Sequence, residues 1–148
     1  MSQATVPFPH PMVRAVDGVA AILDEVAGSE PMFLTTGEKE RLLVSIERQI
    51  ARLESLRART LAAADDVAEC HGARSPGAWL AHETRQDVPA GRRAQRLAHG
   101  LDRRWPQLAE AHADGSVSTA QVQVIGKALD DLPADLDDTI RSPAGAHL

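Results

Sequence analysis

The sequence contains one cysteine, no tyrosine and no long apolar run. A lone Cys70 excludes an internal disulfide and a multi-cysteine zinc site. No stretch approaches the ~18 uncharged apolar residues that a membrane-spanning helix needs. Residues 1–12 contain three prolines and lack the basic and then apolar pattern of a signal peptide. We therefore expect a soluble, cytoplasmic protein that makes no membrane contact.

Aromatic residues are scarce, whereas strong helix formers are abundant. The chain has two phenylalanines and two tryptophans, against 25 alanines and 15 leucines. Strands draw on alternating runs of β-branched and aromatic residues, and such runs are missing, so the composition predicts an all-α fold. So few rings also argue against a base-stacking platform for RNA or single-stranded DNA.

Hydrophobic spacing predicts one helical domain with two tails in the 148 residues. We expect a flexible tail at residues 1–12, a helical domain at residues 13–133 and an acidic tail at residues 134–148. The domain is predicted to be an irregular bundle of about five helices, one of them long. Its first helix is short and amphipathic, and is expected over residues 13–27.

The long helix is predicted over residues 36–69. Thr35 and Glu38 fit a capping box at its start, and residues 38–69 contain neither glycine nor proline. Its apolar stripe is long enough to form a coiled-coil seam with a second copy of the chain or with a partner helix. It could equally form the spine of a bundle within one chain, because only about four heptads exist and alanines interrupt the seam.

Two further helices are expected before the C-terminal third of the chain. Ser75 and Pro76 fit a serine cap followed by proline at the first helical position. A short turn around Gln86 precedes a second helix over residues 89–105, which Pro106 stops or restarts.

The last predicted helix has the clearest local start in the sequence. Ser118 and Gln121 fit a capping box, and Val117 and Val122 flank the cap as a hydrophobic staple. Pro133 is expected to close this helix.

Positive charge is concentrated in the middle of an acidic chain. Residues 74–104 contain seven arginines and three acids, whereas the whole chain has a net charge of −5. On the helix over residues 89–105, the cationic side chains fall opposite the alanines and leucines. The candidate nucleic-acid-binding residues are Arg92, Arg96, His99 and Arg103 on this face, with Arg93 and Arg104 at its flank.

Two interpretations of this stripe are open. It can contact phosphates along a DNA backbone, or it can be a solvated face whose arginines pair with the protein's own acidic segments. The helices on either side of Gln86 resemble a helix-turn-helix in spacing, with a basic second helix. Their connector lacks the glycine common in such motifs, and short-connected helix pairs are also common in ordinary bundles.

No catalytic residue, metal ligand or cofactor is predicted. Cys70 and His71 are adjacent, so they lack the spacing of structural zinc ligands. His82 and Glu83 begin like a helical zinc-protease motif, but Gln86 stands where the second histidine belongs. We interpret the six histidines as surface or capping residues.

The stretch TLAAADDVAECHGARSPGAWLA, residues 60–81, resembles the thirteen-E-twelve repeat family of actinobacteria. The similarity covers roughly residues 36–133, and HGARSPGAWLA is its most specific block. It continues through residues 82–85, Arg92, Arg93, Arg96, Leu97, Ala98, Leu101, residues 106–113, Gly115, Val117, Gln121, Val124, Ile125 and ALDDLP at residues 128–133. In that family, this helical region of unknown function precedes a C-terminal HNH endonuclease module.

The chain departs from the family at its C-terminal end. An HNH site needs a histidine base and metal ligands, often with cysteine pairs that bind zinc, and nothing after Pro133 supplies them. We therefore expect an N-terminal fragment or truncated member that is not itself an enzyme. The leading hypothesis is a non-catalytic module that assists DNA binding through Arg92, Arg96 and Arg103. The alternatives are a helical module for protein interaction or self-association through residues 36–69, and a truncated remnant that folds poorly.

Overall fold

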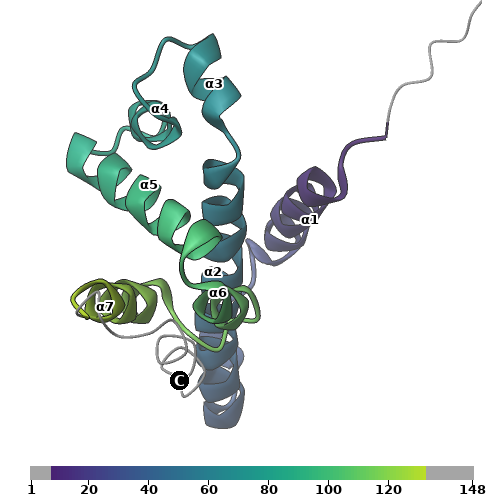
Figure 1. Ribbon diagram of the computed structural model, residues 1–148. Coiled ribbons are helices and arrows are strands. Elements are labelled where there is room, and N and C mark those ends of the chain that lie inside the picture. Colours follow the sequence, from purple (N-terminus) through teal and green to yellow (C-terminus); the bar gives the residue numbers. More distant parts are fainter. Residues whose placement is uncertain (1–7, 133–148) are drawn as a thin grey trace, which may run out of the picture. The chain divides into compact units, whose positions relative to one another are not determined.

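The computed structural model describes residues 8–132, which form seven α-helices and one 3₁₀ turn and contain no strand. The elements are α1 (Pro11–Val26), η1 (Pro31–Phe33), α2 (Thr36–Ala62), α3 (Asp65–Cys70), α4 (Pro76–Glu83), α5 (Val88–Arg103), α6 (Pro106–Ala113) and α7 (Thr119–Asp130) (Figure 1). The predicted all-α class is confirmed for these residues. These residues form more helices than the predicted number of about five, because the long helix divides in two and Pro106 begins a helix of its own. The predicted acidic tail and helix end at Pro133 lie outside the described residues.

The chain divides into two compact units, one ending at Lys39 and the other beginning at Glu40. In the first unit, α1 begins at Pro11, and His10 Nδ1 accepts a hydrogen bond from the Met12 N–H over 3.2 Å. Proline is favoured at this position because an N–H there would have no partner within the helix. The helix therefore starts two residues before the predicted Val13, inside the segment expected to be a flexible tail.

Thr35 and Glu38 form the predicted capping box at the start of α2. The Glu38 N–H donates to Thr35 Oγ1 over 3.2 Å, and the Thr35 N–H donates to Glu38 Oε2 over 2.8 Å. The Thr35 hydroxyl donates to the same carboxylate oxygen over 2.9 Å. These bonds favour the ionised carboxylate and lower the pKa of Glu38, with the backbone N–H as the largest cause.

The long helix ends at Ala62, so the prediction of one helix across residues 36–69 is wrong. The next two N–H groups bond to carbonyls three residues back, which tightens the last turn, and α3 begins at Asp65. Asp65 and Asp66 account for the break, because carboxylates are unfavourable at a helix C-terminus and favourable in the first turn of a new helix. The Asp66 carboxylate also accepts the Val67 N–H over 3.0 Å.

The predicted starts of α4 and α7 are confirmed, whereas that of α5 differs by one residue. Ser75 Oγ accepts the N–H at the third position of α4 over 3.1 Å, and Ser118 and Gln121 make both bonds of a capping box at α7. At α5 the cap is Asp87, whose Oδ1 accepts the N–H at the third helical position over 2.6 Å. The helix therefore begins at Val88, one residue earlier than predicted.

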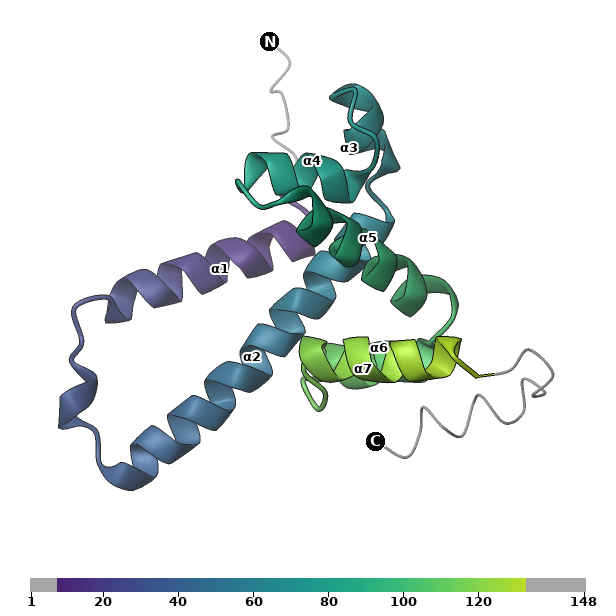
Figure 2. The same ribbon diagram turned by 90° about the vertical axis from the view of Figure 1, so that its left-hand side faces the viewer.

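The core of the second unit lies where α2, α5, α6 and α7 meet. Helix α5 lies between α4 on one side and α6 and α7 on the other in both views (Figures 1 and 2). The buried residues of this core are Ala58 and Leu61 of α2, Ala98 and Leu101 of α5, Leu108 of α6, and Val117 and Val122 at the start of α7. The two valines of the predicted staple thus serve as core residues, and the small alanines let the helices approach closely.

Trp105 fills space that two glycines leave open. The indole ring lies directly over Gly100, and a Cβ added to Gly126 would lie 2.7 Å from the indole Cη2. The ring therefore contacts the backbones of α5 and α7 together. Glycine has a low helix propensity, so Gly100 by itself weakens α5. Its role here is to leave space for the Trp105 ring.

Candidate nucleic-acid interface

Helix α5 and its C-cap residue hold all six side chains that the sequence assigns to nucleic-acid binding. Gly91, Ala98, Gly100 and Leu101 are the buried residues of the helix. The five arginines are exposed, namely Arg92, Arg93, Arg96, Arg103 and Arg104. The helical period therefore separates an inward side of small and apolar residues from an outward side of guanidinium groups.

Two glycines bring α4 and α5 into backbone contact. A Cβ added to Gly91 would lie 2.5 Å from the Gly77 carbonyl oxygen and 2.9 Å from Ala81 Cβ. The Gln95 side chain reinforces this crossing, because its Oε1 accepts the Gly77 N–H over 2.7 Å. That N–H lies in the first turn of α4 and has no acceptor within the helix. Helix α5 is thus held against α4 by packing and by a satisfied polar group.

His99 is half-buried beside Gln95, and the two Nε2 atoms lie 2.9 Å apart. Because Gln95 Oε1 accepts the Gly77 N–H, the amide nitrogen of Gln95 must be the donor and His99 Nε2 the acceptor. The His99 ring then carries its proton on Nδ1. The structure therefore places His99 in a hydrogen bond with Gln95, the residue that connects α5 to α4, whereas the five arginines are exposed.

Arg104 is held by two contacts of its own. Its Nη1 donates to Asp130 Oδ1 on α7 over 2.6 Å. Its guanidinium carbon lies 4.7 Å from the centroid of the Trp105 ring, a cation–π distance. These contacts assign Arg104 to the packing of α7 against α5.

The remaining arginines have weak acidic partners or none among residues 8–132. Arg92 and Arg96 make no ion pair with any described residue, and Arg103 has only its sequence neighbour Asp102, at 3.8 Å. Arg93 faces the N-cap carboxylate of α5 at 4.0 Å. Exposed pairs of this kind contribute about 0–1 kcal/mol, so a phosphate can displace them. We call Arg92, Arg96 and Arg103 the outer arginines; they span about 16 Å of helix axis.

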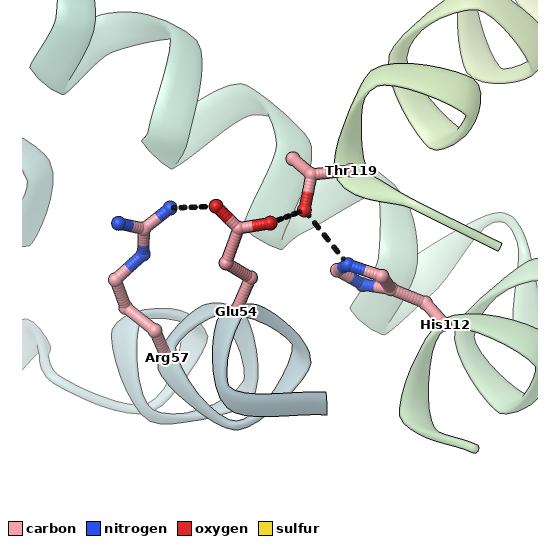
Figure 3. Close-up of polar contacts among 4 residues, drawn as sticks. All are labelled: Glu54, Arg57, His112 and Thr119. Atoms are coloured by element: carbon pink, nitrogen blue, oxygen red, sulfur yellow. Dashed lines mark hydrogen bonds and ion pairs between the residues drawn. The ribbon is translucent and has the colours of Figure 1, made fainter. Parts of the chain in front are cut away.

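A second cluster of polar residues joins α2, α6 and α7 (Figure 3). His112 is fully buried, and its Nε2 lies 2.9 Å from Thr119 Oγ1. The Thr119 hydroxyl donates to Glu54 Oε2, and the other carboxylate oxygen of Glu54 lies 4.0 Å from Arg57. The expectation that all histidines are surface or capping residues is therefore wrong for His112, because packing of three helices covers it.

The direction of these bonds fixes the proton on His112. Because the Thr119 hydroxyl donates to Glu54, it must accept from His112 Nε2–H, which leaves Nδ1 unprotonated. Nδ1 is buried and has no hydrogen-bond partner among the described residues. Burial is the largest cause of a lowered pKa of His112; Glu54 opposes this effect, and Arg57 adds to it.

The cluster contains an acid, a hydroxyl and an imidazole, but their order does not suit nucleophilic catalysis. In a catalytic triad the histidine lies between the nucleophile and the acid, so that it can take the hydroxyl proton. Here Thr119 lies between His112 and Glu54, and its proton already goes to the carboxylate. Complete burial of His112 also keeps substrates away from the ring. The cluster connects three helices and gives no sign of a reaction centre.

The described residues contain neither a cluster of metal ligands nor a helix that could span a membrane. Within residues 8–132, no three histidine, cysteine, aspartate or glutamate side chains gather as metal ligands would. His71 stacks on Trp79 with ring centroids 5.5 Å apart, and Cys70 is exposed. Among the helices of this part of the chain, none carries an apolar stretch of the length that crosses a bilayer.

One comparison with known proteins identifies a family for most of this chain. Residues 36–148 match a family described as Domain of unknown function (DUF222). No curated protein and no solved structure matches the chain. The matched span begins with α2 and includes the core, the arginine-bearing α5 and the buried cluster. Because it covers well over half of the 148 residues, the chain belongs to the family described as Domain of unknown function (DUF222).

Proposed function

We propose that the protein is a non-catalytic helical module that assists DNA binding through the outer arginines. The observation that carries this proposal is the exposure of Arg92 and Arg96 without an acidic partner in residues 8–132, on a helix that α4 holds in place. Arginine suits phosphate recognition because its planar guanidinium donates several hydrogen bonds and always keeps its charge. Arg103 joins them once its weak pairing with Asp102 is exchanged for a phosphate.

Two features favour duplex DNA over other anionic partners. The pair α4 and α5 has the order of a helix-turn-helix, in which the second helix approaches the DNA. The similarity to the thirteen-E-twelve repeat family further implies that such helical regions occur beside HNH endonuclease modules, whose substrate is DNA. With an overall charge of −5, the chain repels DNA in general, so contact is confined to the basic face.

The salt dependence of duplex binding tests this proposal. Replacing Arg92, Arg96 and Arg103 by alanine should make the slope of log K against log salt concentration shallower by about 3, one unit for each lost phosphate contact. Fluorescence anisotropy of a labelled duplex, titrated at several salt concentrations, measures this slope.

A matched control variant removes three arginines at exposed positions outside α5. Arg14, Arg41 and Arg59 are exposed on α1 and α2, and their triple alanine variant should keep the slope of the parent chain. Equal slopes for both triple variants would reject the outer arginines as the contact. Absence of duplex binding by the intact chain at low salt would reject the function itself.

Self-association is a second candidate function, favoured by an apolar stripe on α2. Leu42, Leu43, Ile46, Ile50 and Leu53 follow helical spacing and are 39–65 % exposed. Exposed apolar surfaces of this kind mark interaction sites, and a second copy of the chain offers the same stripe for a two-fold symmetric contact. The seam is shorter than the predicted residues 36–69, because α2 ends at Ala62.

Light scattering across a range of protein concentrations tests self-association. The intact chain should form dimers as its concentration rises, and Ile50→Glu should keep it monomeric, because a buried unpaired carboxylate opposes the contact. Gln49→Glu adds the same charge at an exposed neighbouring position and should leave the dimer largely intact. A strictly monomeric parent chain at every concentration would contradict the idea.

A further inference from the structure

Helices α3, α4 and α6 end in the same kind of left-handed turn. In each, the N–H that follows the turn donates to a carbonyl five residues back, over 2.8–2.9 Å. The turn residue has a positive φ of 62° at Gly72, 82° at Gly115 and 55° at Arg85. This hydrogen-bond pattern is the Schellman motif, in which glycine is the preferred turn residue.

Arg85 is the exception among these three turns. Glycine enters the left-handed region without steric cost, whereas the Cβ of an L-residue crowds the following carbonyl oxygen. The Arg85 side chain is exposed, and its guanidinium makes no hydrogen bond or ion pair within residues 8–132. The backbone bonds of the motif hold the turn in this conformation. The Arg85 side chain makes no polar contact among the described residues that would favour arginine over glycine here, so its guanidinium is left available to a ligand.

The position of Arg85 in the fold indicates the kind of ligand that its side chain meets. It lies in the connector between α4 and α5, two residues before the N-cap Asp87, so it precedes the arginine-bearing helix by less than one helical turn of sequence. Arg92, the first exposed arginine of α5, follows in the second turn of that helix. When a second helix approaches a duplex, the turn before it passes close to the phosphate backbone.

We propose that Arg85 is a phosphate-contacting residue of the same DNA surface, retained in a left-handed turn at the expense of stability. This inference rests on the proposed function of the outer arginines and adds the helix connector to the surface. The ligand of Arg85 is the phosphate backbone of duplex DNA. Stability and DNA affinity should therefore respond in opposite directions when the residue is changed to glycine.

Three substitutions separate the charge from the backbone strain. Arg85→Gly should raise the melting temperature by about 2–4 °C, because glycine relieves the strained φ. The same variant should weaken duplex binding by about five- to tenfold at 0.1 M salt and make the salt slope shallower by about 1. Arg85→Ala should lose the same affinity without the thermal gain, and Arg85→Lys should keep most of the affinity.

The readouts also distinguish this inference from the function on which it rests. If Arg85→Gly binds the duplex as the parent does, while the triple variant of the outer arginines loses its salt slope, the Arg85 contact is overturned and the DNA surface stands. If the parent chain binds no duplex, both proposals are overturned. A melting temperature that falls in Arg85→Gly would show that the arginine stabilises the fold, and would also overturn the inference.

Discussion

Replacing Gly91 by alanine is expected to lower the free energy of unfolding by about 2–3 kcal/mol. The added Cβ would lie 2.5 Å from the Gly77 carbonyl oxygen and 2.9 Å from Ala81 Cβ, so α4 and α5 would have to separate. Backbone atoms form the closest contact, and no rotation of a side chain can relieve it. The separation would also lengthen the hydrogen bond from the Gly77 N–H to Gln95.

The sign of this effect is informative because alanine normally stabilises a helix by about 1 kcal/mol relative to glycine. Gly37→Ala is the matched control: Gly37 lies in the first turn of α2, and its added Cβ would meet no atom within 4 Å. Denaturant unfolding followed by circular dichroism should show a small gain for Gly37→Ala and a large loss for Gly91→Ala. A neutral or stabilising Gly91→Ala would show that the backbones of α4 and α5 do not approach each other this closely.

The helix starts were predictable from sequence because their signals are local. Thr35 with Glu38, Ser75 with its following proline, and Ser118 with Gln121 each satisfy N–H groups within three residues. Such contacts depend on backbone geometry that the helix itself provides. Sequence spacing therefore located these ends without knowledge of the tertiary fold.

The end of α2 shows where hydrophobic periodicity fails. The apolar stripe continues past Ala62, but two consecutive aspartates favour a new first turn over the last turn of a long helix. Periodicity counts apolar residues and ignores this electrostatic preference. Helix propensity alone is also misleading for Gly91. In the sequence this glycine argues against a stable helix, whereas in the structure it allows the backbones of α4 and α5 to come into contact.

Only part of the geometry of the candidate site could be predicted from the sequence. The exposure of the outer arginines follows from the helical period, which a sequence displays directly. The pairing of Arg104 with Asp130 spans 26 residues, and the contact from Thr119 to Glu54 spans 65, so only the tertiary fold reveals them. Arg85 was visible in the sequence only as a non-glycine residue in a turn; its left-handed φ was not.

Lowering the pH from about 7 to about 5 is expected to destabilise the fold through His112. Burial lowers the pKa of His112 below its usual value of 6.5, so the unfolded chain binds the proton at a higher pH than the folded chain does. Where the unfolded chain binds more protons, stability rises with pH. The stability that the neutral ring provides is therefore complete above about pH 6.5. It declines by up to about 1.4 kcal/mol per pH unit as the pH falls toward the folded-state pKa.

The pH window identifies His112 among the groups with shifted pKa values. Glu38 and Asp114 also have lowered pKa values, but from 4.5 and 3.8, so their contributions are lost only at more acidic pH. His112→Gln keeps an Nε2–H donor for Thr119 and removes the titrating ring, so its unfolding free energy should change much less between pH 7 and pH 5. Urea unfolding at each pH measures both chains. If the unfolding free energy of His112→Gln falls as steeply between pH 7 and pH 5 as that of the parent chain, protonation of His112 does not destabilise the fold. The acid sensitivity would then belong to another group.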